Sequence, residues 1–180
     1  MLFRSPREAD HEPTDEVAAA LCERFPGSVA AASHGQVVVH VERAVLADVA
    51  RFLRDDQRFT MCVDVTAVDH LRTAVRTLPA AVAPERFEVV VNFLSHPSNR
   101  RIRVVTQVPA SEPTVPSLTA VYPGTDFPER EAFDLLGITF EGHPDLARIL
   151  MPDDWIGHPL RKDTPAARVP VTFKGSPSPR

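Results

Sequence analysis

The uneven placement of proline constrains the fold of this 180-residue chain more than any other feature. Twelve of the eighteen prolines lie in residues 109–180. The proline ring blocks the continuation of a helix, and its missing N–H removes a donor from any sheet. We therefore expect most of the regular secondary structure before residue 109 and a largely irregular chain after it.

Residues 13–108 have the periodic patterns of one small domain. Apolar side chains recur at helical spacing in residues 13–25 and 43–54. Runs typical of strands complete the pattern, at residues 28–33, 36–41, 59–68, 87–94 and 102–108. The order α-β-β-α-β-β-β predicts a two-layer α+β domain, with the helices on one face of a mixed sheet.

The remaining segments are predicted to be less regular. Residues 1–12 are expected to form a flexible leader, and residues 73–84 a loop. In residues 109–180 we expect one short helix, at 128–136, closed by Gly137 in a left-handed conformation. The rest of this Pro-rich segment mixes charges and turn residues with apolar anchors, namely Ile138, Phe140, Leu146, Ile149, Leu150, Trp155 and Leu160. We expect it to lie extended on a surface, partly its own domain and partly another protein.

Composition excludes several kinds of protein. A formal net charge of −4 lacks the basic excess of a nucleic-acid binder, so no nucleic-acid partner is expected. No run reaches the roughly 18 apolar residues of a membrane span, so we expect a soluble, cytoplasmic chain. Cys22 and Cys62 have no metal-ligand spacing and are interpreted as packing residues. Two cysteines cannot supply the four ligands of an iron–sulfur cluster.

The acidic side chains of the predicted helix admit two interpretations. Glu131 and Asp134 stand three residues apart on one helical side, which suits acid–base chemistry or metal binding. Solvated acids, or partners for Arg130, are the favoured interpretation. Glu129 and Glu131 also fall in the first turn, where negative charge suits the helix dipole.

Two histidines near the C-terminus, His143 and His158, each stand in a Gly-His-Pro triplet. With Asp145 and Asp154 they invite a metal-site interpretation. No short ligand pair occurs, however, and Gly-His-Pro is suited to turns, so turn formation is favoured. Trp155, the only tryptophan, is either an interface anchor or a side chain packed within its own chain.

A cationic run, Arg100, Arg101 and Arg103, lies at the last predicted strand. Phosphate contact is one interpretation. A solvated sheet face or an acidic neighbouring protein is favoured. The chain has no glycine-rich nucleotide loop of either common pattern, so no nucleotide site is predicted.

Several segments together resemble the C-subunit family of complex I, the 30 kDa subunit family of NADH:quinone oxidoreductases. The resemblance is strongest in EREAFDLLGI from Glu129, in FEGHPDL from Phe140 and in RILMP from Arg148. DDW and GHPLRKD extend it to Asp163, and DVTAVDHL, RFEVVVNFLS and NRRIRV match upstream, from residue 64. The chain departs from the family pattern at Asp126-Phe127-Pro128, Leu136 and Thr164.

The resemblance implies an α+β domain whose C-terminal segment lies over other peripheral-arm subunits, especially the large subunit of the quinone site and the one that bears the terminal iron–sulfur cluster. It implies no catalytic residue and no cofactor in this chain, with FMN and the Fe-S clusters in partner subunits. Membrane association, on the cytoplasmic side, would come only through the complex. The residues expected at partner interfaces are Glu129, Arg130, Glu131, Asp134, Gly137, His143, Pro144, Arg148, Trp155, His158, Arg161 and Lys162.

Three hypotheses for function follow. The leading one is an assembly subunit of proton-translocating NADH:quinone oxidoreductase. A relative in a hydrogenase-like complex, or one with another electron donor, is a second. A stand-alone metal-dependent hydrolase using the His- and Asp-containing tail is a third, and metal content distinguishes it from the first.

Overall fold

The computed structural model describes residues 15–73 and 75–164. The predicted leader, the first two residues of the first predicted helix and the last part of the predicted tail lie outside these ranges. The helices are α1 (Glu16–Arg24), α2 (Leu46–Asp55) and α3 (Asp126–Leu136), and two short 3₁₀ turns, Arg43–Val45 and Pro123–Thr125, precede α2 and α3. The strands are β1 (Val29–Ser33), β2 (Gln36–Val41), β3 (Met61–Asp69), β4 (Phe87–Ser95), β5 (Arg100–Val108), β6 (Thr114–Pro116) and β7 (Thr139–Glu141).

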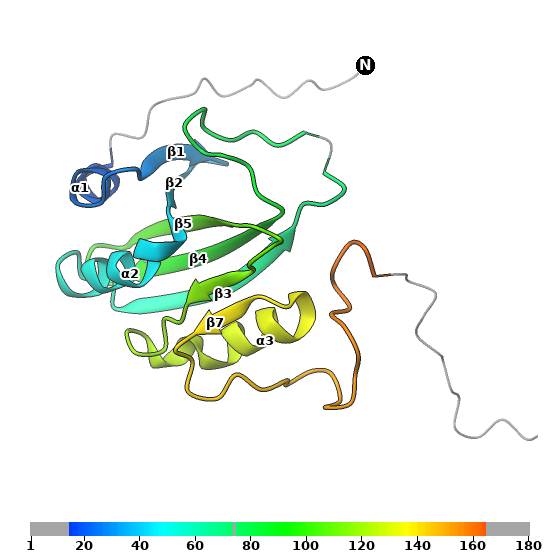
Figure 1. Cartoon of the computed structure of the whole chain (residues 1–180). Helices are drawn as coiled ribbons and strands as arrows, with labels where there is room; N and C mark the ends of the chain where they lie inside the picture. The colour runs from blue at the N-terminus through cyan, green and yellow to red at the C-terminus, as the bar shows by residue number, and fades with distance from the viewer. Residues whose placement is uncertain (1–14, 74, 165–180) are drawn as a thin grey trace, which may run out of the picture.

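Five strands form one mixed sheet in the order β1-β2-β5-β4-β3. Only the β2–β5 pair is parallel, and the other neighbours are antiparallel. Figure 1 shows α2 in front of this sheet and α3 alongside β3. The predicted α+β class, mixed sheet and element order up to residue 108 are confirmed. The parallel pair β6–β7 was not predicted, because its strands have only three residues each and one contains a proline.

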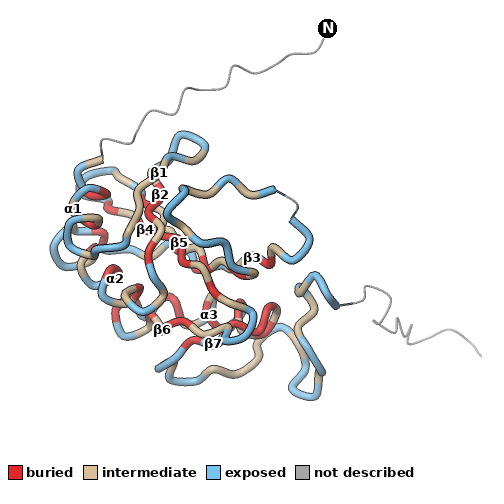
Figure 2. Tube along the Cα trace, turned by 45° about the horizontal axis from the view of Figure 1, so that its top comes forward, coloured by how far each residue is buried: buried red, intermediate tan, exposed pale blue. Residues whose placement is uncertain are grey.

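The core lies between the sheet and the helices. Every second residue of β4, from Phe87 to Phe93, is buried on this core face, and Ile102 and Val104 of β5 lie beside them. Leu46, Val49 and Leu53 of α2 close the other side of the core. Figure 2 shows the buried positions gathered between these elements, with exposed positions in the connecting turns. Strand alternation and helical spacing therefore converge on one hydrophobic core.

The chain after β5 belongs to this core. Its buried apolar side chains join the same cluster as those of the sheet, and they are Val115, Leu118, Val121, Tyr122, Ala132, Leu136, Ile138 and Phe140. The Tyr122 hydroxyl donates to the Phe59 carbonyl at 2.6 Å, just before β3. Whether residues 13–108 fold without the later chain stays a prediction. In the structure, buried residues between 115 and 140 belong to the same core as the sheet.

The predicted helix at 128–136 is confirmed and begins two residues earlier, at Asp126. Pro128 fits because the first helical turn needs no intrahelical N–H donors. Gly137 ends the helix with φ of 71°, as predicted.

Replacing Tyr122 with Phe tests whether the later chain stabilises the sheet. We expect a loss of about 1–2 kcal/mol in the free energy of unfolding, because the buried Phe59 carbonyl loses its donor. Urea denaturation of the purified chain measures the loss, with the exposed hydroxyl of Ser111, replaced by Ala, as control. Equal stability of Tyr122→Phe and the wild type would contradict the inference.

Candidate interaction site

Residues 142–164, here called the C-terminal strap, fold back against α3 and the end of β3. Figure 1 shows this segment in yellow to orange beside α3. Its Leu160 N–H donates to the Leu135 carbonyl at 3.0 Å, and the Arg161 Nε donates to the Leu136 carbonyl at 2.6 Å. The strap is irregular, as the proline content predicts, yet it is fastened by specific hydrogen bonds.

The carboxylate of Asp134 is the centre of the first fastening. Its Oδ1 accepts from Arg148 Nη1 at 2.6 Å, and its Oδ2 accepts the backbone N–H groups of residues 149–151 at 2.8–3.1 Å. The side chain is fully buried. Burial acts to raise the pKa of Asp134, but these donors outweigh it and hold the pKa at about 2. Arg148 Nη2 also donates to the Gly157 carbonyl at 3.0 Å, which links the earlier part of the strap to its later part.

Asp69, at the end of β3, is the centre of the second fastening. Arg86 donates to both of its oxygens, at 2.9 and 3.1 Å, and the Leu71 N–H donates at 2.9 Å. The strap adds the Lys162 N–H, at 2.8 Å. Burial acts to raise the pKa of Asp69, but the Arg86 and backbone hydrogen bonds outweigh it and lower the pKa to about 2. Two buried, ionised carboxylates therefore hold the strap, one near each end.

Gly137 makes room for the strap at the end of α3. A Cβ atom built at this position would lie 2.5 Å from His158 Nε2 and from Arg161 Nη2. His158 Nδ1 lies 2.9 Å from the Asp134 carbonyl. Only glycine therefore combines the left-handed backbone with this close approach.

Glu129 and His143 fasten α3 to its neighbours in the chain. Glu129 is fully buried and accepts from Ser117 Oγ at 2.6 Å and from the Leu118 N–H at 2.7 Å. Burial raises the pKa of Glu129, although these hydrogen bonds oppose the shift. The buried ring of His143 accepts the Asp145 N–H through Nδ1 at 3.0 Å.

The interpretation of Glu129 and Asp134 as solvated acids is wrong, because both carboxylates are fully buried and hydrogen-bonded. It holds for Glu131, which is exposed. Arg130 lies 3.9 Å from Asp126 and donates Nε to the Ala147 carbonyl at 3.0 Å, so its main partner is also the strap. Glu129 and Asp134 therefore serve internal packing, while Glu131 lies on the solvated face.

The described residues contain no group of three or more His, Cys, Asp or Glu side chains that could hold a metal ion. Cys22 and Cys62 are half-buried free thiols against the core, and burial raises the pKa of Cys62 to about 12. The rings of His143 and His158 instead lie within hydrogen-bonding distance of backbone atoms, at Asp126 and Asp145 for His143 and at Asp134 for His158.

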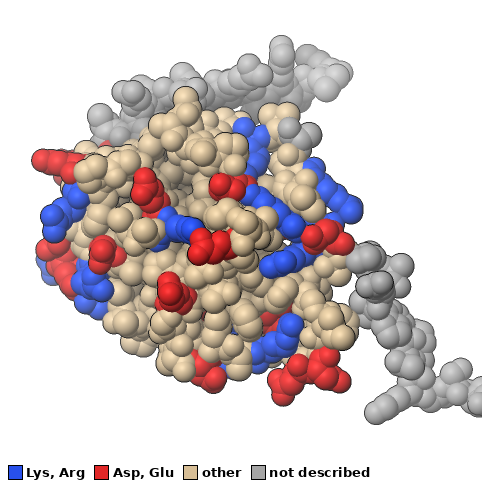
Figure 3. Space-filling model, viewed as in Figure 1, with Lys and Arg blue, Asp and Glu red and all other residues tan. Residues whose placement is uncertain are grey.

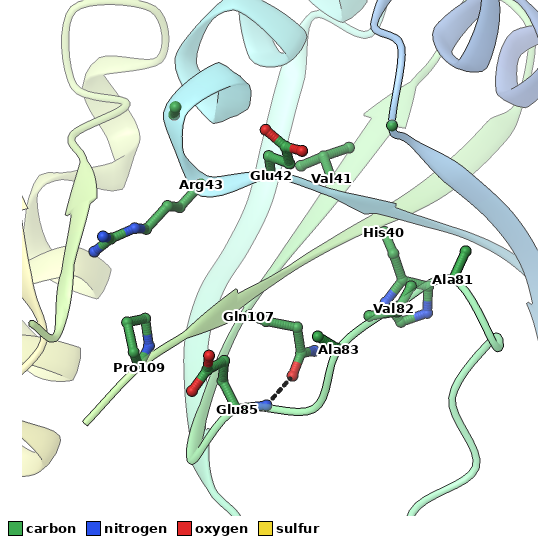
Figure 4. Close-up of a pocket in the computed structure, with 12 residues that line it drawn as sticks. His40, Val41, Glu42, Arg43, Ala81, Val82, Ala83, Glu85, Gln107 and Pro109 are labelled. Atoms are coloured by element: carbon green, nitrogen blue, oxygen red, sulfur yellow. Dashed lines mark hydrogen bonds between the residues drawn. The ribbon is translucent and has the colours of Figure 1, made fainter. Parts of the chain in front are cut away.

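A cleft of about 510 Å³ lies elsewhere, between the end of β2 and the loop before β4. Figure 4 shows Glu85, Gln107 and His40 around it, with the Glu85 N–H bonded to Gln107 Oε1 at 3.1 Å. None of the twelve predicted interface residues lines it. Figure 3 shows Lys and Arg intermingled with Asp and Glu over the face that is drawn, rather than gathered by sign.

Four apolar side chains of α3 and the strap are exposed, among charged residues that are exposed as well. Their exposed fractions are 65% for Phe127, 58% for Leu150, 96% for Ile156 and 55% for Leu160. Of the twelve predicted interface residues, Glu131, Pro144 and Lys162 are exposed, and Trp155 is half-buried. Ile156 was missed by sequence reasoning. The available signal was an isoleucine between Trp155 and a Gly-His-Pro turn, in a segment with no helical or strand periodicity that would bury it.

Comparison with known proteins identifies the family. The model of the family described as "Respiratory-chain NADH dehydrogenase, 30 Kd subunit" matches residues 39–169. The chain belongs to this family. The match includes both fastening carboxylates and the whole strap, and the resemblance found in the sequence is confirmed.

Two relatives, both described as the C subunit of NADH-quinone oxidoreductase, illustrate the similarity. One, from Salinispora arenicola, is 43% identical over 172 residues and covers 92% of this chain. The other, from Nocardioides sp., is 46% identical over 147 residues and covers 81% of this chain. The chain spans 66% of the length of the first relative and 55% of the second.

The fold of this member of the 30 Kd subunit family also matches a solved structure, a trypsin-resistant fragment (1-134) of Nqo5. The two share 29% identity with a TM-score of 0.62, over 72% of this chain and 99% of the fragment. In the described residues, no helix combines the length and apolar character of a membrane-spanning helix.

The two fastening carboxylates predict that the chain loses stability in acid. Both pKa values are about 2 when folded, below the roughly 3.9 of an unfolded Asp, so their contribution is present above pH 4 and is lost as pH falls toward 2. Asp134→Asn should lower the free energy of unfolding at pH 7 by about 2 kcal/mol and flatten this acid dependence.

Urea titrations followed by Trp155 fluorescence test this directly, because the only tryptophan lies in the strap. Glu131→Gln, which changes an exposed carboxylate of the same helix, is the matched control and should behave like the wild type. An acid dependence as steep in Asp134→Asn as in the wild type would show that Asp134 is not a fastening group.

Proposed function

We propose that this chain is the C subunit of a proton-translocating NADH:quinone oxidoreductase, where it acts without catalytic residues or cofactors of its own. The observation that carries this proposal is the family match over residues 39–169, which includes the strap. In this function the chain holds neighbouring peripheral-arm subunits in place, so that electrons pass from NADH through FMN and Fe-S centres elsewhere to quinone.

The geometry supports a positional function. The side chains that carried the resemblance meet in the fastenings of the strap, not in a cleft: Glu129, Asp134, Arg148, His158 and Arg161 each bond to another part of the chain. Acid–base catalysis needs a group free to reach a substrate. Groups held by one to four internal partners instead fix the shape of a surface.

We infer that the partners are other peripheral-arm subunits, chiefly the large one at the quinone site and the one that bears the terminal iron–sulfur cluster. The chain reaches the cytoplasmic side of the membrane only through them. Phe127, Leu150 and Ile156 supply apolar contact area without a covering element among the described residues. Exposed apolar side chains of this kind are available for contacts between subunits.

The two alternatives are separated by different observations. A hydrolase would need His143 or His158 to be available for a metal, whereas the His143 ring is fully buried and each ring lies within hydrogen-bonding distance of the backbone. A related complex with another electron donor would use the same strap, so the identity of co-purifying subunits decides between donors.

Replacing Ile156 with Asp should sharply reduce assembly of the intact complex. A charge on this 96% exposed side chain leaves the isolated fold unchanged but disfavours burial against a neighbouring protein, by about 2 kcal/mol or more. Native gels of membranes, stained for NADH:quinone activity, measure the assembled fraction. Val75→Asp, at an 85% exposed position in the loop before β4, is the matched control.

Normal assembly of the Ile156→Asp chain would contradict the inference that this part of the strap contacts another subunit. Loss of assembly with both variants would point to a general effect of added charge.

The purified chain should contain no stoichiometric metal and no visible absorption band. The physical reason is the absence of a nucleotide loop and of four cysteines in the sequence. Elemental analysis and an absorption spectrum of native protein check this. A bound metal at one equivalent, lost on substitution of His143 or His158, would instead support the hydrolase.

A further inference from the structure

The second face of the sheet, opposite α1 and α2, is covered over only part of its width. Near β1, β2 and β5 the loop residues Thr77, Leu78 and Pro79 lie over it, enclosing a cavity of about 570 Å³. Under this loop, Val38 is 4% exposed and Val105 is 5% exposed. No residue of β3 lines that cavity.

Over β3 the same face is open, and its apolar side chains are interspersed with the exposed Asp64 and Thr66. Its exposed fractions are 43% for Met61, 42% for Val63 at the β-bulge and 38% for Val68, and Leu71 follows at 49%. Met61 pairs with Leu94 of β4, which extends the apolar surface across two strands. Here the open sheet face denotes Met61, Val63, Val68, Leu71 and Leu94.

The charges around the open sheet face are mostly positive, although the whole chain carries −4. Arg101 pairs in register with Leu94, and Arg103 pairs with Asn92, which itself pairs with Asp64. Arg72 adjoins Leu71 and is exposed. Neither Arg72 nor Arg101 forms an ion pair with another described residue. The acids at these positions on β3 and β4 are Asp64 and Glu88, and Glu88, which pairs in register with Val68, is already bound to Arg76 and His70.

We propose that the open sheet face is a second docking surface, which binds a protein of the same assembly that presents apolar side chains bordered by Asp or Glu. This inference rests on the proposed function and concerns a surface separate from the strap. Met and Arg beside apolar strands are the composition of a protein interface, and an acidic border complements the arginines.

Other occupants fit these observations less well. A second copy of the chain would bring Arg72, Arg101 and Arg103 against themselves, with only Asp64 and the already ion-paired Glu88 to offset them. A membrane is reached by amphipathic helices or protruding side chains, whereas side chains on a flat sheet stand level with one another. Both remain as outcomes of the test.

The test uses the tagged full chain, purified with its complex from native membranes. Met61→Glu/Val68→Glu should lower the yield of intact complex about tenfold or more, and Arg101→Glu should lower it less and most strongly at low salt. Val75→Glu, exposed but outside the open sheet face, should match the wild type. Thermal melting of each isolated variant verifies folding.

A second measurement does not depend on any variant. Peroxide oxidation of the Met61 thioether, followed by mass spectrometry, should be fast in the isolated chain and slow in the complex, because docking covers this side chain. Equal rates, or normal assembly of the double variant, overturn the proposal.

Two further outcomes distinguish docking of a protein from membrane binding and from self-association. Equal complex yield with loss of binding to phosphatidylserine vesicles would establish a membrane surface, and loss of a concentration-dependent dimer would establish self-association. Either overturns the proposal. A wild-type chain that brings down no other component of an NADH:quinone oxidoreductase overturns the proposed function as well, whereas normal capture with an insensitive open sheet face overturns this inference alone.

Discussion

The buried, ionised carboxylate of Asp134 is the interaction on which the outer surface of this protein depends. A carboxylate removed from water needs several donors, and the strap supplies four of them, from Arg148 and three consecutive backbone N–H groups. The dependence is mutual. Without Asp134 these N–H groups lack a partner, and without the strap the carboxylate is buried and uncompensated.

The strap is an irregular segment whose hydrogen-bond donors are used internally. Donors of the strap bind the two fastening carboxylates, whereas its Leu150 and Ile156 side chains are exposed. Proline contributes by preventing helix formation in this segment, and Gly137 contributes by admitting the strap close to the helix end. Under the proposed function, an irregular surface held by such internal bonds suits contact between subunits, which rewards preorganisation.

Much of the fold was predictable because it follows local periodicity. The strand alternation from Phe87 and the helical spacing around Val49 each identify a buried face without knowledge of the rest of the chain. The burial of Glu129 and Asp134 could not be predicted in this way. Acids on a short helix resemble a solvated face, and their partners lie up to 17 residues away in segments without a periodic pattern. Asp69 was missed for the same reason, because its strap partner is 93 residues away.

An electron cryomicroscopy structure of the intact complex containing this chain tests the central claim most directly. We predict that the strap keeps its Asp134–Arg148 contact in the complex while Phe127, Leu150 and Ile156 are buried against other subunits. A strap that is detached from Asp134, or one whose apolar side chains face solvent in the assembled enzyme, would contradict this claim.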